Sequence, residues 1–192
     1  MHKSVVLCIT GASGAIYAER FLKHGLRLGL NLHCVVSSNA RLVLEDELGI
    51  SYSEFKRKYS SVTFHEPNDF RSPLASGSFL KKRISSVVVL PCSVSTLGKV
   101  ANGCGSNLIH RICDVAIKEG VQLILAVREM PLSTIHLENM LKLQQMGVRA
   151  FPISPAFYGN PKTLNELVDF VVGKIFDLMG VDNDIYNRWG EG

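Results

Sequence analysis

The chain has 192 residues, long enough for one domain with one substantial core, and its composition, 46% hydrophobic and 20% charged, excludes a disordered polypeptide. Its net charge of +4 comes from 21 Lys and Arg spread along the sequence without a long basic run, which argues against a nucleic-acid-binding protein. The five cysteines include no CxxC pair, and no apolar run approaches the roughly 18 residues of a membrane-spanning helix, so we expect a cytoplasmic protein that binds no membrane.

Apolar runs of strand length alternate with segments of helical periodicity along the chain. The expected strands are residues 4–9, 32–36, 87–90, 123–127 and 150–153. The expected helices are residues 15–28, 40–48, 107–118, 133–146 and 163–179. This alternation predicts an α/β fold with a parallel sheet and helices on both of its faces. Residues 60–79 are polar, contain two prolines and show little periodicity, so we expect a long loop there.

The chain shows no internal repeat and no second domain. Residues 1–192 are therefore expected to form a single domain with a short C-terminal tail over about residues 181–192. Two helix starts are marked by capping side chains, because Ser133 and Thr163 each precede an apolar-periodic stretch. Glu166 stands three residues after Thr163, which is the spacing of a capping box.

In folds of this kind ligands bind beyond the carboxyl ends of the strands, so the segments that follow the strands are the candidate site. Residues 10–15, TGASGA, follow the first strand, and their small side chains let backbone N–H groups approach an anion at a helix N-terminus. The same residues also suit a tight turn with close helix–sheet packing. The loop only half-resembles a GxSxG nucleophile elbow, and no His or acid is evidently paired with Ser13, which disfavours a serine hydrolase.

Polar groups also follow the second and third strands. Ser37 precedes a helix on which Glu47 shares the apolar face of Val43 and Leu44. A carboxylate buried there would have a raised pKa suited to proton transfer, whereas a partly exposed Glu at the helix end is the alternative. Residues 91–96, PCSVST, offer hydroxyl groups either to the polar edge of a ligand or to the cap of a helix.

Cationic and aromatic side chains are the remaining candidates. Arg111 and Lys118, seven residues apart, share one helix face that either meets an anion or is solvated. Arg128 and Glu129, at the end of the fourth strand, suit either a ligand clamp or a structural ion pair. Tyr158 follows the fifth strand, where its ring and hydroxyl suit either packing or binding.

Seven segments stand out when they are taken together. They are residues 10–15 (TGASGA), 75–79 (ASGSF), 91–97 (PCSVSTL), 111–119 (RICDVAIKE), 127–141 (VREMPLSTIHLENML), 155–158 (PAFY) and 188–191 (RWGE). In this order they resemble the UbiX-type flavin prenyltransferases, and the run over residues 128–141 is the most specific of them. The resemblance covers nearly the whole chain.

The resemblance implies a three-layer αβα sandwich with a flavodoxin-like or Rossmann-like parallel sheet, assembled as a homododecamer. It implies binding of reduced FMN as prenyl acceptor and dimethylallyl monophosphate as donor, and nothing in the sequence calls for a metal. The flavin-contacting positions would be Gly11, Ala12, Ser13, Ser37, Ser93, Val94, Ser95, Thr96 and Arg128. The prenyl-phosphate surroundings would be Arg111, Lys118, Arg128, Glu129, Tyr158 and Lys174. The catalytic residues would be Glu47, Ser13, Lys118 and Glu129.

By resemblance, N5 of reduced FMN attacks the allylic carbon as phosphate leaves, and a second bond to C6 closes a fourth ring. Cations would hold the departing phosphate, Glu47 would assist proton movement, and the product would serve a separate decarboxylase. The family often has Arg where this chain has Lys174, which keeps the charge but not the bidentate fork. Trp189 matches a tail residue placed near a neighbouring subunit's site, and a packing anchor is the alternative.

Three other functions compete with this interpretation. A flavin-dependent cysteine decarboxylase of the same fold would carry a PxMNxxMW-type segment, which this sequence lacks. A direct aromatic-acid decarboxylase and a non-enzymatic flavin store stay open, and turnover with dimethylallyl monophosphate would separate both from a prenyltransferase.

Overall fold

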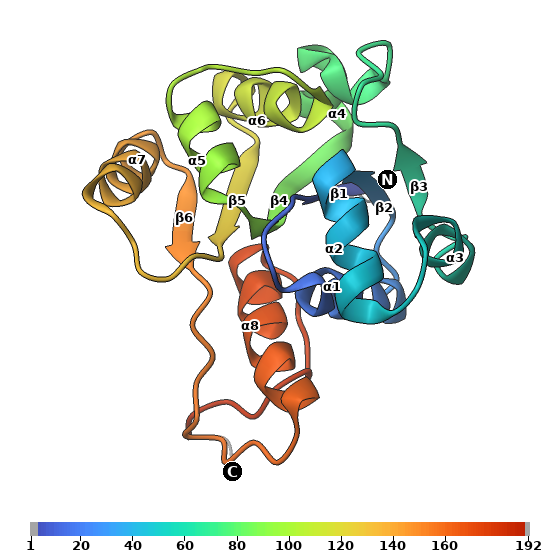
Figure 1. Cartoon of the computed structure of the whole chain (residues 1–192), viewed down its shortest axis with the longest axis vertical. Helices are drawn as coiled ribbons and strands as arrows, with labels where there is room; N and C mark the ends of the chain where they lie inside the picture. Colours follow the sequence, from blue (N-terminus) through green and yellow to red (C-terminus); the bar gives the residue numbers. More distant parts are fainter. Residues whose placement is uncertain (1–3, 191–192) are drawn as a thin grey trace.

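The computed structural model describes residues 4–190, which build one six-stranded parallel sheet (Figure 1). The strands are β1 (Ser4–Ile9), β2 (Leu32–Val36), β3 (Thr63–His65), β4 (Ile84–Cys92), β5 (Gln122–Val127) and β6 (Arg149–Pro152). Their order across the sheet is β3-β2-β1-β4-β5-β6. This is the strand order of the doubly wound Rossmann fold, so the predicted α/β class is confirmed.

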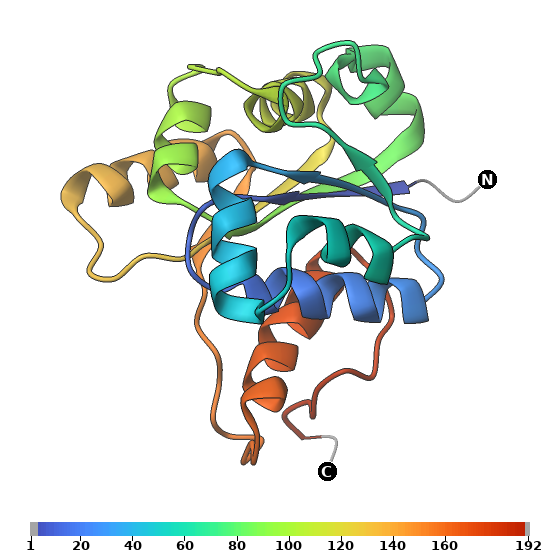
Figure 2. The ribbon, with the colours of Figure 1, turned by 45° about the vertical axis from the view of Figure 1, so that its right-hand side comes forward.

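Helices cover both faces of the sheet (Figure 2). They are α1 (Ala15–Arg27), α2 (Ser38–Leu48), α3 (Tyr52–Lys58), α4 (Gly77–Arg83), α5 (Val94–Ala101), α6 (Leu108–Glu119), α7 (Thr134–Gln145) and α8 (Leu164–Leu178), with a 3₁₀ turn η1 (Pro73–Ala75). α1, α2, α3 and α8 pack on one face, and α4 to α7 pack on the other. Within residues 4–190, no helix is long and apolar enough to span a membrane.

Strand side chains alternate between two hydrophobic cores. In β1, Val6 and Cys8 face the core under α4 to α7, whereas Val5, Leu7 and Ile9 face the core under α1 and α8. Because both faces are covered, the central strands are apolar at nearly every position. β1 and β2 begin and end as the sequence predicts, whereas β4 extends beyond the predicted residues 87–90 at both ends.

The prediction of one long loop over residues 60–79 is wrong. The segment contains β3, η1 and the start of α4. β3 has only three residues and pairs on one side, with β2, so it is too short to show a period of its own and depends on contacts made far along the chain. The sequence also did not predict the helices α3 and α5, each of which spans only about two turns.

The predicted helix starts at Ser133 and Thr163 are confirmed. The Ser133 hydroxyl accepts a hydrogen bond from the His136 N–H, and the Thr163 hydroxyl accepts one from the Glu166 N–H. The Glu166 carboxylate does not close a standard capping box on Thr163. It accepts the Lys162 N–H at 2.7 Å and the Thr163 hydroxyl at 3.1 Å instead.

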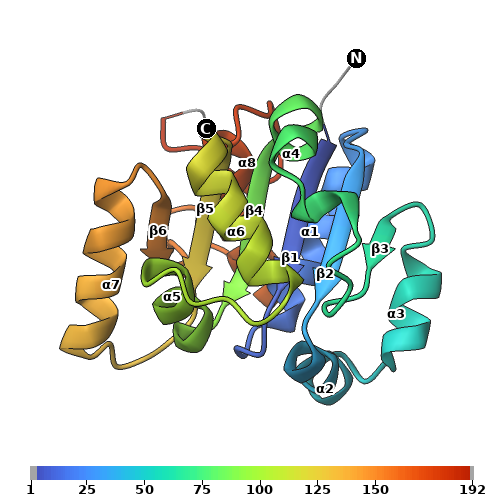
Figure 3. The ribbon, with the colours of Figure 1, turned by 90° about the horizontal axis from the view of Figure 1, so that it is seen from above.

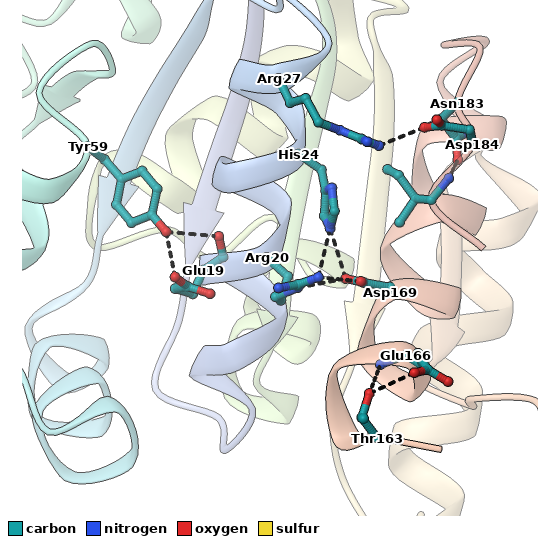
Figure 4. A network of polar contacts seen from close by, with 11 residues as sticks. Glu19, Arg20, His24, Arg27, Tyr59, Thr163, Glu166, Asp169, Asn183 and Asp184 are labelled. Carbon is teal, nitrogen blue, oxygen red and sulfur yellow. Dashed lines mark hydrogen bonds and ion pairs between the residues drawn. The ribbon is translucent and has the colours of Figure 1, made fainter. Parts of the chain in front are cut away.

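A buried ionic cluster holds α8 against α1 (Figure 4). The Asp169 carboxylate accepts from Arg20 and, at 2.9 Å, from Nε2 of His24. Burial lowers the pKa of His24 despite the charge of Asp169, so His24 is neutral at pH 7 and donates as an imidazole N–H. On the other side of α1, the Tyr59 hydroxyl donates to the Glu19 carboxylate at 2.6 Å. These contacts fix α1, whose N-terminus lies at the candidate site.

The chain after β6 forms an arm beside α8 (Figure 1). The predicted tail begins near residue 181 and is described as far as Gly190, so Glu191 of the RWGE segment lies outside the described residues. Asp177 of α8 holds the tail, because its carboxylate accepts from the Tyr186 hydroxyl at 2.5 Å and from Arg188 at 2.7 Å. Chiefly through Arg188, these bonds lower the Asp177 pKa from 3.8 to about 2.

The connections from the two central strands leave in opposite directions. α1 leads from β1 to β2, whereas α5 and α6 lead from β4 to β5. Such a change of direction opens a crevice between the carboxyl ends of β1 and β4. Figure 3 shows α5 next to the carboxyl end of β4 and α2 beyond β2, on the two sides of this crevice.

Candidate functional site

A polar cleft of about 280 Å³ lies at the carboxyl ends of β1, β2 and β4. Five predicted flavin contacts line it: Gly11, Ser37, Ser93, Ser95 and Thr96. Six further residues complete the lining: Thr10, Ser38, Asn39, Lys99, Asn107 and His110. The cleft therefore lies at the crevice where a doubly wound sheet binds its ligand.

The buried Thr10 hydroxyl ties the ends of β1 and β4 together. It donates to the Pro91 carbonyl at 2.7 Å and accepts the Ser93 N–H at 2.8 Å. The Ser93 hydroxyl then accepts the Thr96 N–H at 3.3 Å and so caps α5. Thr10 thereby positions the loop that carries the predicted flavin contacts from Ser93 to Thr96.

Three helices begin at the cleft, each with a capping side chain. Ser37 caps α2, Ser93 caps α5 and Asn107 caps α6. The first N–H groups of each helix have no partner within the helix itself, and the helix dipoles add positive potential there. The arrangement suits an oxygen-rich anion such as a phosphate.

The loop over residues 10–15 is both a tight turn and part of the cleft. A Cβ atom on Gly11 would lie 2.7 Å from the Asn39 Cβ, so only glycine lets the first two βα loops approach this closely. Gly14 has a φ of 108°, a left-handed conformation that favours glycine. Of the neighbouring predicted contacts, Ala12 is buried and Val94 half-buried, so each has mainly its backbone to offer a ligand.

Of the two alternatives for Glu47, the structure confirms the exposed Glu at the helix end and excludes the buried carboxylate with a raised pKa. Glu47 is exposed and reaches across to α1, where its carboxylate accepts the Gly14 N–H at 2.9 Å and the Ala15 N–H at 2.7 Å. Partial burial alone would raise its pKa, but hydrogen bonds from Ser13, Ala15 and Gly14 outweigh this and lower it. Glu47 is therefore ionised at pH 7 and occupies the α1 N-terminus.

Arg128 lies beside this carboxylate. A Cβ on Gly14 would be 3.9 Å from the Arg128 Cγ, and the Arg128 charge contributes to the lowered Glu47 pKa. Glu129 is half-buried, and its carboxylate accepts the Met130 N–H at 3.1 Å. The structure thus brings together Ser13, Glu47 and Arg128 as a charged group next to the polar cleft.

The two predicted cations of α6 lie apart from this group. Arg111 donates to the Ala75 carbonyl at 3.2 Å and pairs with Asp114 at 2.9 Å. Lys118 is exposed and pairs with Glu119 at 3.2 Å. α6 runs back from the carboxyl ends of the strands to the start of β5. Lys118, in its last turn, therefore lies toward the amino ends of the strands, opposite the cleft.

Tyr158 and Lys174 also lie outside the cleft, on the arm and on α8. The Tyr158 ring, on the arm, packs edge-on against Phe170 and Trp189, with ring centroids 5.8 and 5.3 Å apart. Lys174 lies in the last turns of α8, 3.9 Å from Asp177. Within one chain, Trp189 thus packs against Tyr158 while remaining 79% exposed.

Of the six further cleft residues, Thr10, Ser38 and Asn39 lie within two residues of predicted flavin contacts in the sequence. Lys99, Asn107 and His110 are those that sequence reasoning missed. Lys99 belongs to α5, whose two turns contain a glycine and give little periodicity. Asn107 lies at the predicted start of the following helix, and an Asn before an apolar-periodic run is an N-cap signal that marks it. Within residues 4–190, no cluster of three or more His, Cys, Asp or Glu side chains could hold a metal ion.

Comparison with known proteins identifies the family. A family model described as Flavoprotein matches residues 1–176. The flavin prenyltransferases UbiX of Methanocaldococcus jannaschii and Aquifex aeolicus are each 46% identical to this chain, over 186 and 187 residues, with 97% of this chain and 98% of each relative covered. The chain belongs to the UbiX flavin prenyltransferase family.

Solved structures agree with the UbiX assignment. The chain resembles AnUbiX (PadA1) in complex with FMN and dimethylallyl pyrophosphate, with a TM-score of 0.93, 35% identity and all of both chains covered. It also resembles a dodecameric FMN-dependent UbiX-like decarboxylase from Escherichia coli O157:H7, with a TM-score of 0.90, 37% identity and coverage of 97% and 98%. The peptidyl-cysteine decarboxylase EpiD, at 16% identity and a TM-score of 0.65, shares the fold.

Proposed function

We propose that this enzyme is a flavin prenyltransferase, which joins the dimethylallyl group of dimethylallyl monophosphate to N5 and C6 of reduced FMN. The observation that carries the proposal is the 46% identity, over nearly the full length, to flavin prenyltransferases UbiX from two organisms. The likeness to a complex that contains FMN and dimethylallyl pyrophosphate supports both ligands. The chain is then a transferase, and its product serves as cofactor of a separate decarboxylase.

The donor groups of the cleft fit FMN. Capped N-termini of α2 and α5 and the hydroxyl groups of Ser37, Ser93 and Ser95 suit the phosphate and the ribityl chain. Ser13, Glu47 and Arg128 lie next to this cleft, where the isoalloxazine ring would extend. Reduced flavin supplies the nucleophilic N5 and C6 atoms when bound.

Glu47 serves in proton movement as an acceptor. Its lowered pKa keeps it ionised, so Oε1 and Oε2 can take a proton released at the flavin edge but hold none to give. The Ser13 hydroxyl and the Gly14 and Ala15 N–H groups fix the carboxylate in place. Arg128 beside it balances the negative charge near the reaction centre.

The leaving phosphate needs several positively charged side chains close together. Within a single chain, the residues predicted for this role lie apart from one another. Lys118 and Lys174 lie away from the cleft, and Tyr158 lies on the arm. Arg111 lies in an adjoining pocket, which it lines together with Lys99, Asn107 and His110 of the cleft. We infer that the prenyl-phosphate site, including Glu129, is completed where subunits meet. Positively charged groups at that place would stabilise the departing phosphate.

Such a site requires an assembly, and we propose a homododecamer. A UbiX-like structural relative is dodecameric. Large apolar side chains that would otherwise face water support the assembly: Met130, Ile135, Leu141, Phe157 and Trp189, which are 59 to 87% exposed. Light scattering tests it, and the mass of a 21.2 kDa monomer at assay concentration would contradict it.

We further propose that residues 1–192 form a single flavoprotein domain with its tail over about residues 181–192, and that the enzyme works in the cytoplasm. The continuous sheet and the tail's bonds to Asp177 support a single unit. Five free cysteines, of which Cys8, Cys34, Cys92 and Cys113 are buried, support a reducing compartment.

A decarboxylase is the second candidate, because two structural relatives carry that name, one of them a phenylacrylic acid decarboxylase from Aquifex aeolicus. One experiment separates the two functions. The enzyme is incubated with reduced FMN and dimethylallyl monophosphate, and the flavin is released and weighed by mass spectrometry. Gain of one five-carbon prenyl unit supports the transferase, whereas carbon dioxide release from an aromatic acid without such a gain supports the decarboxylase.

A further inference from the structure

Lys99 is the only lysine or arginine among the residues that line the polar cleft. It lies on α5, half-buried, two turns after the helix begins at the Ser93 cap. Its ammonium group donates to the Ser106 hydroxyl at 3.3 Å, which holds the side chain toward the loop before α6. An ammonium group has three N–H donors, so two remain for a ligand in the cleft.

The neighbouring His110 does not supply a second positive charge. Burial, together with the charge of Lys99, lowers the His110 pKa, so the imidazole is neutral at pH 7. Its Nδ1 accepts the Ser106 N–H at 3.2 Å, which leaves the proton on Nε2. His110 can therefore offer one neutral hydrogen bond, and the counter-charge of a bound anion falls to Lys99.

The α1 end of the site is unsuited to a phosphate. Its first N–H groups already donate to Glu47, at 2.9 Å from Gly14 and 2.7 Å from Ala15. A phosphate dianion there would lose those donors and meet a second negative charge. The N-termini of α2 and α5 carry no such carboxylate among the residues that line the cleft, and Lys99 lies on their side.

We propose that Lys99 is the phosphate-recognition residue of the flavin site, whose ammonium group binds the 5′-phosphate of FMN and selects FMN over riboflavin. The inference rests on the proposed function, because it takes the cleft to be the flavin site. It adds the orientation of the ligand: the phosphate lies between α2, α5 and Lys99, and the ring points toward Glu47 and Arg128.

The test compares the affinities of FMN and riboflavin for the full-length enzyme by quenching of flavin fluorescence. Lys99→Met should weaken FMN by about 10-fold or more, the size of a hydrogen bond to a charged group, and leave riboflavin unchanged. Lys99→Arg keeps the charge and should retain most of the preference for FMN. Lys23→Met, which removes an exposed lysine of α1, is the matched control and should change neither affinity.

Salt adds a second readout. The FMN affinity of the wild type should fall as salt rises, and this dependence should be weaker in Lys99→Met, because one screened charge contact is gone. If Lys99→Met keeps the full preference for FMN over riboflavin, the role of Lys99 is refuted while the flavin site stands. If the wild type binds neither flavin, the proposed function itself fails.

Discussion

Replacing Thr10 by Val removes one hydroxyl group from the place where β1 meets β4. The two side chains have nearly the same shape, so the change leaves no cavity. Thr10 is 3% exposed, and its hydroxyl both donates to the Pro91 carbonyl and accepts the Ser93 N–H. The variant therefore isolates the two hydrogen bonds that join the end of β1 to the loop of predicted flavin contacts after β4.

The cost follows from what each partner loses. The Pro91 carbonyl keeps the Thr10 N–H at 3.3 Å, so losing the hydroxyl there costs about 1 kcal/mol. The half-buried Ser93 N–H loses its acceptor, which costs about 1–2 kcal/mol more. A total of about 2–3 kcal/mol should lower Tm by about 4–12 °C in a domain of this size.

Thr10→Ser is the matched control, because it keeps the hydroxyl and loses one methyl group, worth about 0.8 kcal/mol. Thermal unfolding and FMN titration are measured on both variants at one protein concentration, since assembly makes Tm depend on concentration. Thr10→Val should also bind FMN more weakly than Thr10→Ser. The Thr10 hydroxyl positions Ser93, and Ser93 caps α5, whose N-terminus is proposed to bind FMN. Equal stability and equal FMN affinity in the two variants would refute the role of the hydroxyl.

Three further predictions concern catalysis and stability. Lys118→Ala should slow prenyl transfer by about 10²–10³-fold in single-turnover assays, because the Lys118 charge is proposed to stabilise the leaving phosphate, while FMN affinity, measured in parallel, should change little. Lys23→Ala is the control, and a wild-type rate in Lys118→Ala would refute the phosphate role. Glu47→Gln should bind both ligands but slow the proton-dependent steps, since the amide oxygen can still cap Gly14 and Ala15 but cannot take a proton; an unchanged rate across pH would contradict this. Because the pKa of Asp177 is lowered from 3.8 to about 2 in the folded state, its ionised carboxylate stabilises the fold at pH values above 3.8. This contribution to the free energy of unfolding is lost as the pH falls toward about 2. Asp177→Asn should lower the free energy of unfolding at neutral pH and flatten its fall over that acid range, and an unflattened acid profile in urea titrations would argue against the tail contact.

Much of the fold could be predicted because its signals are local. β1 and β2 are apolar apart from Ser4 and His33, and Ser133 and Thr163 mark their helices with caps. The missed elements have no such signals. β3 has three residues and exists through its pairing with β2, and α5 interrupts its two turns with Gly98.

The candidate site was predicted in part, for a related reason. The small and hydroxyl-bearing residues after β1 and β4 lie at strand ends, and strand ends can be read from the sequence. The partner of Glu47 cannot be read from the sequence in this way. A helical wheel shows which residues of α2 share a face with Glu47, but not that its carboxylate reaches the α1 N-terminus, 32 residues away along the chain. Lys99 is likewise a cleft residue only because α5 and the loop before α6 fold together.

The most direct test of prenyl transfer is a single turnover without oxygen, with enzyme in excess over reduced FMN. Dimethylallyl monophosphate and diphosphate are supplied in parallel, and the flavin is analysed by mass and absorbance at successive times. We predict that the flavin gains one five-carbon unit and that phosphate is released in equal amount with the monophosphate. Flavin of unchanged mass with both donors, from enzyme that binds FMN, would contradict the assignment of this chain as a flavin prenyltransferase.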